Sequence, residues 1–129
     1  MNYLEEEIDE ALNTLKIEHK KIVAREIDQL IKSLTKKYFK TESTLLDAME
    51  FNETKTEHNP NFWQEIKNRI KNPDLILLVF DTDYRAWNIN NSQDLESIIG
   101  ETTGYPFWLT DRNLTFLLHL DDHDCIISA

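Results

Sequence analysis

The first half of the chain has the hydrophobic spacing of amphipathic helices. Apolar residues recur every three or four positions from Leu4 to Leu15, and again from Val23 to Tyr38. This spacing places them on one face of a helix. The polar residues 16–21 between the two patterns form either a turn between two helices or the exposed side of one long helix. The pattern therefore predicts a helical N-terminal region and does not decide whether residues 16–21 interrupt the helix.

Residues 43–73 predict shorter elements. Ser43 is suited to cap a short helix that runs to about residue 51, and the polar residues 52–59 are typical of a loop. Asn59 followed by Pro60 is a favourable helix start, because an N-cap residue precedes a proline at the first helical position. The helix predicted there has one apolar face and ends at the next proline, and that face consists of Phe62, Ile66 and Ile70, with Trp63 beside it.

After Pro73 the pattern changes from helix to strand. Residues 75–80 are continuously apolar, as expected of a strand that is covered on both faces. The pattern further predicts a turn at 81–83, a strand at 84–89, a short helix capped by Ser92 and closed by Gly100, a hairpin of 105–110 with 114–120, and a last strand at 125–128 after the turn 121–124.

These elements together predict an α+β fold in one domain. N-terminal helices precede a mostly antiparallel sheet of about four to five strands with one inserted short helix. We expect a single domain over residues 1–129, with residues 1–72 mainly helical and residues 73–129 rich in strands. A chain of this length is sufficient for one hydrophobic core.

Charge divides the chain at the same place. Residues 1–73 hold 14 Asp/Glu and 12 Lys/Arg, whereas residues 74–129 hold 10 Asp/Glu and 2 Lys/Arg. The net charge of −10 therefore belongs mostly to the strand-rich part. Nucleic-acid binding requires a basic surface, and anionic lipid also attracts basic segments. We expect a basic protein as partner, and neither nucleic acid nor a membrane.

The remaining composition points to the cytoplasm. Cys125 is the single cysteine and has no internal disulfide partner, which fits a reducing compartment. The N-terminus lacks the basic and apolar regions of a secretory signal, and residues 75–80 are too short to span a membrane.

The acidic turn 121–124 is the strongest candidate for chemistry. Its carboxylates and His123, with His119 or Asp111, are residue types that bind divalent metals. Their spacing matches neither a calcium loop nor a zinc motif, and a polar turn explains the same residues without a ligand. We therefore expect no metal ligand and no cofactor.

Other catalytic arrangements are weaker. Asp81 and Asp83 follow the buried strand, where a pair of carboxylates would be placed for acid–base catalysis, but turn residues commonly have this composition. Cys125 lies in an apolar run and is expected to be a buried thiol, although His123 is two residues away. No glycine-rich phosphate loop is present in the sequence. We expect no catalytic residue.

The aromatic residues of the second half suggest contact anchors. Strand alternation sends about half of them to the core, and those on the other face, such as Trp108 or Trp87, would be available to a partner.

The segments 87–89, 105–111 and 114–127, with their tryptophans and acidic histidine-containing turn, resemble small bacterial proteins that end in a tryptophan-bearing hairpin. They also resemble the SMI1/KNR4-like superfamily. That resemblance implies an immunity protein that acts against a polymorphic toxin.

The sequence thus predicts a non-enzymatic cytoplasmic immunity protein that occludes a basic toxin, such as a nuclease. The predicted contact residues are Asp81, Asp83, Asp111, Asp121, Asp122 and Asp124, with Trp108 as the anchor. One alternative is a regulatory or adaptor domain that binds a protein through its helices, using Ile17 and Ile22. Another is a small metal-assisted hydrolase built on residues 119–124. The oligomeric state stays open.

Overall fold

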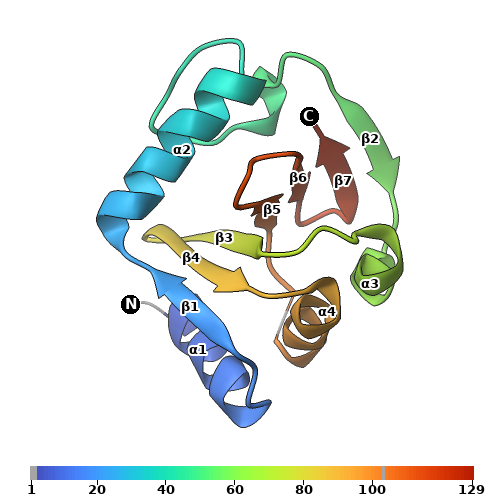
Figure 1. The fold of residues 1–129 in the computed structure, drawn as a ribbon. Coiled ribbons are helices and arrows are strands. Elements are labelled where there is room, and N and C mark those ends of the chain that lie inside the picture. Colours follow the sequence, from blue (N-terminus) through green and yellow to red (C-terminus); the bar gives the residue numbers. More distant parts are fainter. Residues whose placement is uncertain (1–2, 103) are drawn as a thin grey trace.

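A computed structural model describes residues 3–102 and 104–129 and shows an α+β fold (Figure 1). One seven-stranded antiparallel sheet carries helices on both of its faces. In chain order the elements are α1 (Tyr3–Thr14), β1 (His19–Ile22), α2 (Ala24–Tyr38), the short 3-10 helix η1 (Ala48–Glu50), β2 (Lys55–His58), the 3-10 helix η2 (Phe62–Gln64), α3 (Ile66–Arg69), β3 (Leu75–Asp81), β4 (Asp83–Ile89), α4 (Ser92–Glu101), β5 (Phe107–Asp111), β6 (Leu117–Leu120) and β7 (Cys125–Ser128).

The strand β3 lies at the centre of the sheet. The strand order is β1-β4-β3-β5-β6-β7-β2, and each neighbouring pair is antiparallel. In β3, Leu78 lies opposite Ala86 of β4 and opposite Trp108 of β5. The prediction that the apolar run forms a strand covered on both faces is confirmed for residues 75–79, which are all buried.

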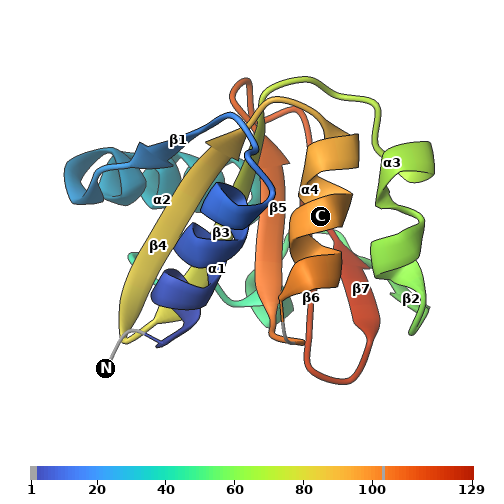
Figure 2. The same ribbon diagram turned by 90° about the horizontal axis from the view of Figure 1, so that it is seen from below.

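The two faces of the sheet have separate cores. Leu75, Leu77 and Val79 pack under α1, α3 and α4, while Ile76 and Leu78 pack under α2 and the segment 39–51. Figure 2 shows this arrangement, with α1, α4 and α3 on the near side of the sheet and α2 behind it. Because side chains alternate along a strand, one continuous apolar run supplies both cores.

The predicted strand count was too low. The strands β1 and β2 form the two edges of the sheet, where the sequence predicted a helix connection and a loop. Both are four residues long and mostly polar, with the sequences HKKI and KTEH. An edge strand pairs on one side only and needs no apolar alternation, so short polar strands leave little signal in the sequence.

The break between the first two helices is a strand. The helices α1 and α2 lie on opposite faces of the sheet, and β1 connects them. Ile17 is partly buried against the core under α1, and Ile22 is partly buried against the core under α2. Both residues that the adaptor alternative assigned to a partner thus contact the protein's own cores. Within residues 3–102 and 104–129, no helix combines the length and apolar character that crossing a membrane requires.

Several local predictions need correction. The helix expected after Pro60 is divided into η2 and α3, although its apolar residues Phe62, Ile66 and Ile70 are buried as predicted. Asp47, rather than Ser43, caps the short helix η1.

The helix α4 also has a different boundary from the one expected. Its N-cap is Asn91, whose side chain accepts from Asp94 N at 2.9 Å, so the cap precedes Ser92 by one residue. The helix continues through Gly100 to Glu101.

A partly buried hydrogen bond between side chains links helix α1 to the sheet. Trp87 is fully buried, and its Nε1 donates to Asp9 Oδ1 at 2.8 Å, while Asp9 Oδ2 lies 2.7 Å from Lys21 Nζ. We expect Asp9→Ala to lower the free energy of unfolding by about 1–3 kcal/mol, because the indole N–H would remain buried without an acceptor. Urea unfolding followed by tryptophan fluorescence measures this. Glu10→Ala, at an exposed position of the same helix, is the control, and an equal loss there would contradict the assignment.

Candidate functional site

Two turns of the chain lie at the same end of the sheet. The β3–β4 turn at residues 81–83 lies beside the start of β5, because Leu78 pairs with Trp108. The β6–β7 turn at residues 121–124 lies at the same end, because Phe107 pairs with Leu120. Adjacent strands are about 4.8 Å apart, so β3 and β6, with β5 between them, are separated by about 10 Å. Figure 2 shows both turns at the lower edge of the sheet, the β3–β4 turn at the left and the β6–β7 turn right of centre.

We call this region the acidic end and define it by Asp81, Asp83, Asp121, Asp122 and Asp124. Five of the six aspartates that the sequence selected are therefore brought to one place. In the described part of the chain, no lysine or arginine forms an ion pair with any of the five carboxylates. The imidazole of His123 lies nearby, with its Nε2 3.7 Å from Asp122 Oδ1. The acidic end thus presents a largely uncompensated negative field.

Two of these aspartates also shape the backbone. Asp121 Oδ1 accepts hydrogen bonds from His123 N and Cys125 N, each at 2.9 Å, and so holds the β6–β7 turn. Burial opposes ionisation of Asp121, but these backbone hydrogen bonds outweigh it and lower its pKa. Asp81 Oδ2 accepts from Glu5 N at 2.9 Å, which caps the first turn of α1. Asp83, Asp122 and Asp124 are exposed.

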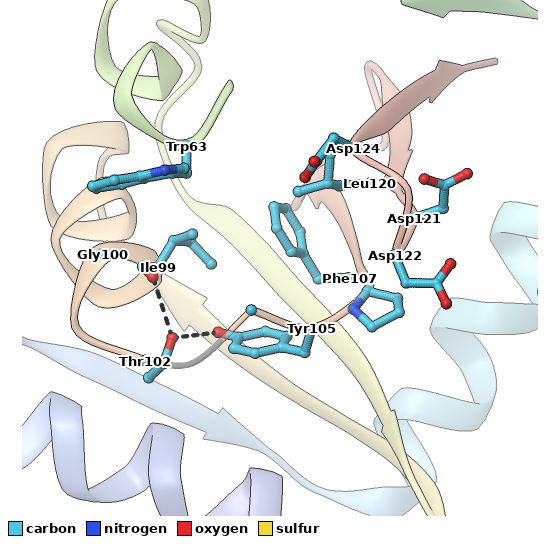
Figure 3. A pocket seen from close by; sticks show the side chains of 12 residues that line it. Trp63, Ile99, Gly100, Thr102, Tyr105, Phe107, Leu120, Asp121, Asp122 and Asp124 are labelled. Carbon is cyan, nitrogen blue, oxygen red and sulfur yellow. Dashed lines mark hydrogen bonds between the residues drawn. The ribbon is translucent and has the colours of Figure 1, made fainter. Parts of the chain in front are cut away.

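A cavity of about 450 Å³ opens beside the acidic end, on the face that carries α4. We call it the Trp63 pocket; its lining comprises Trp63, Ile99, Gly100, Thr102, Gly104, Tyr105, Pro106, Phe107, Leu120, Asp121, Asp122 and Asp124. Figure 3 shows Trp63 on one side and Asp124 on the other, with the carboxylate of Asp124 directed toward the tryptophan. The carboxylates of Asp121 and Asp122 point away from it. The pocket thus combines an aromatic wall, an apolar floor and one inward carboxylate.

The wall formed by Trp63 depends on a glycine. A Cβ added at Gly100 would lie 2.8 Å from Trp63 Cζ3, which is closer than van der Waals contact permits. The indole therefore lies directly against the backbone of α4, and its exposed fraction is 38%. At Gly104, which also lines the pocket, an added Cβ would meet nothing within 4 Å.

Tyr105 closes the lower side of the pocket as a neutral group. Burial raises the pKa of its phenol to about 12, and Thr102 Oγ1 donates to its hydroxyl oxygen at 3.0 Å (Figure 3). The phenol is therefore uncharged at neutral pH and adds no second anion to the pocket.

A second hollow lies on the opposite face of the same end. We call it the Phe80 groove; it has a volume of about 340 Å³ and is lined by Leu46, Asp47, Ala48, Met49, Phe80, Tyr84, Pro106, Trp108, His119, Asp121 and Ile127. Phe80 is 58% exposed and Met49 is 83% exposed at its rim. Exposed apolar side chains next to a charged surface are typical of protein contacts.

Trp108 is not exposed in the way that the sequence analysis expected. It is 6% exposed and packs in the core under α2, with its ring centroid 5.9 Å from that of Phe51 and 4.1 Å from that of His119. Burial of His119 lowers its pKa, which favours the neutral ring that stacks on Trp108. Trp108 therefore supports the floor of the Phe80 groove, and Phe80 and Met49 are the exposed apolar residues there.

Asp111 lies at the other end of the sheet, where β3 begins, opposite Leu75. It is 4% exposed and accepts hydrogen bonds from Asn72 Nδ2 at 3.1 Å, Thr115 N at 2.9 Å and Thr115 Oγ1. Burial opposes its ionisation, but these donors outweigh it and lower the pKa of Asp111. Asp111 is a turn residue of the β5–β6 hairpin, remote from the other aspartates.

The sequence analysis missed Trp63, Phe80 and Met49. Phe80 ends the apolar run of β3, and its exposure arises because the helical cover on that face stops before the end of the strand. In the predicted helix, Trp63 lies beside the apolar face and not within it. That position is the feature of the sequence that indicated its partial exposure.

The structure brings no metal-binding group together in the described ranges, 3–102 and 104–129, since no three His, Cys, Asp or Glu side chains converge there. His119 Nδ1 instead lies 3.0 Å from Phe107 O, as a hydrogen-bonding pair.

No protein-family model matches this chain, and a search of curated proteins finds no significant match. The resemblance to the SMI1/KNR4-like superfamily therefore stays a prediction.

Proposed function

We propose that this protein is a non-enzymatic binding protein that neutralises a basic protein toxin, such as a nuclease, by covering its substrate-binding surface. The observation that carries the proposal is the acidic end, where five aspartates from two separate turns meet without a basic ion-pair partner among the described residues. A surface of this kind attracts a cationic surface and repels nucleic acid.

The apolar rim of the Phe80 groove supports the same proposal. Binding interfaces combine exposed apolar anchors with a polar surround, and the anchors contribute most of the affinity. Phe80 and Met49 supply such anchors on one face of the acidic end, and Trp63 supplies one on the other. A partner that spans the end of the sheet would contact both faces and the aspartates between them.

Charge complementarity accounts for the mechanism. A nuclease binds its phosphate backbone through lysine and arginine side chains, and the acidic end offers carboxylates to the same side chains. Occupation of those cations by the protein excludes the nucleic acid. No chemical step is required, so inhibition is reversible and weakens with salt.

Affinity capture from source-cell lysate tests the proposal. The bait is the wild-type chain, and the comparison is a variant with Asp83→Asn, Asp122→Asn and Asp124→Asn. We expect the wild type to retain a basic protein that is released by salt, and the variant to lose at least about nine-tenths of it, because its cationic contacts lose their anions.

The control carries Glu18→Gln, Asp28→Asn and Glu53→Gln, which remove the same charge at exposed positions away from the acidic end. Co-expression of the captured protein then shows whether the wild-type chain restores growth where the acidic-end variant does not. Equal capture by all three baits, or a partner that is harmless when expressed alone, would refute the neutralisation proposal.

A further inference from the structure

We propose that the Trp63 pocket receives one arginine side chain of the partner, with its guanidinium stacked on the Trp63 indole and paired with the Asp124 carboxylate. This inference rests on the proposed function and specifies which part of the acidic end binds a side chain of the basic partner. The pocket volume of about 450 Å³ lies in the range of sites that hold small organic groups.

The chemistry of the lining favours arginine. A guanidinium is planar, stacks on aromatic faces and pairs with carboxylates, and tryptophan is the strongest aromatic partner for a cation. The methylene groups of the arginine would lie over Phe107 and Leu120, which are apolar and form the floor between Trp63 and Asp124 (Figure 3). A lysine ammonium is compact and strongly hydrated and gains less from an aromatic wall.

The pocket is held open before binding. Trp63 is fixed against Gly100, where an added Cβ would lie 2.8 Å from its ring. Asp124 has a positive φ of 62°, a backbone conformation that aspartate and asparagine tolerate. A preformed site loses less conformational entropy on binding than a flexible one does.

The test uses the protein alone and a defined probe. N-acetyl-arginine amide is titrated into ¹⁵N-labelled protein, and the indole N–H resonance of Trp63 and the amide resonances of Gly100 and Asp124 are followed by NMR. N-acetyl-citrulline amide, which has the shape of arginine without its charge, is the matched probe. We expect saturable shifts with arginine at a dissociation constant of about 1–10 mM, and binding at least about tenfold weaker with citrulline.

Two pairs of variants locate the site. Asp124→Asn keeps the shape and tolerates the positive φ, and we expect it to weaken arginine binding about tenfold, whereas Asp28→Asn on α2 removes the same charge elsewhere without effect. Gly100→Ala displaces the indole and is expected to weaken binding at least about fivefold. Ser97→Ala, at an exposed position of the same helix that does not line the pocket, should leave binding unchanged.

Absence of a saturable shift at about 50 mM arginine would overturn the inference, as would equal binding of citrulline or unchanged binding by Asp124→Asn. Each of these results is obtained without the partner. A failed titration combined with successful capture by the wild type would refute the arginine site alone. Arginine binding without a captured partner would support the site and count against toxin neutralisation.

Discussion

Replacement of Trp108 by alanine is expected to lower the free energy of unfolding by about 3–5 kcal/mol, the usual cost of deleting a large buried aromatic side chain. Trp108 is 6% exposed and contacts three rings, those of Phe39, Phe51 and His119. The cavity would open in the core under α2, between the sheet and the segment 39–51. A loss of this size is a large fraction of the stability of a small domain.

Urea unfolding followed by far-UV circular dichroism measures this loss, because that signal does not depend on the deleted tryptophan. Phe80→Ser is the comparison at the rim of the same groove, and we expect it to cost about 1 kcal/mol or less, since Phe80 is 58% exposed and its main aromatic contact is Tyr84. If Phe80→Ser were the more destabilising change, the assignment of Trp108 to the core and Phe80 to the surface would be wrong.

The centre of the fold was predictable because its signal is local. The apolar run of β3, the hairpin of β5 and β6 and the last strand Cys125–Ser128 each have a distinct pattern within a few residues. The edge strands had no such pattern. Lys55 pairs with Ser128, more than seventy residues away, and only that long-range hydrogen bonding makes the segment a strand.

The candidate site was predictable as a set of residues but not as a place. Aspartates in turns are readily recognised, yet only strand order determines which turns lie at the same end of a sheet. Asp83 and Asp122 come together because β3, β5 and β6 are neighbours, whereas Asp111, in the next turn along the chain from β5, lies at the opposite end. Trp108 was assigned to the wrong environment because both faces of this sheet are covered, so alternation alone cannot identify an exposed residue.

Charge reversal at the acidic end is expected to slow association with the basic partner by about 10- to 100-fold at low salt. Asp83→Lys with Asp122→Lys replaces two of the five carboxylates by ammonium groups, so most of the attractive long-range field is lost where the partner approaches. Neither side chain is buried, and therefore the free energy of unfolding should change little. The association rate constant should therefore change, while the stability of the fold should not.

Biolayer interferometry with the captured partner at about 50 and 300 mM salt measures both rate constants. The control Glu18→Lys with Asp28→Lys changes the net charge equally, but Glu18 lies at the opposite end of the sheet and Asp28 lies on α2. We expect the two variants to differ about tenfold at low salt and to converge at high salt, because the Debye length falls from about 14 Å to about 6 Å over this range. If both variants slowed association equally, net charge alone would attract the partner. The acidic end would then not be the surface that meets the toxin.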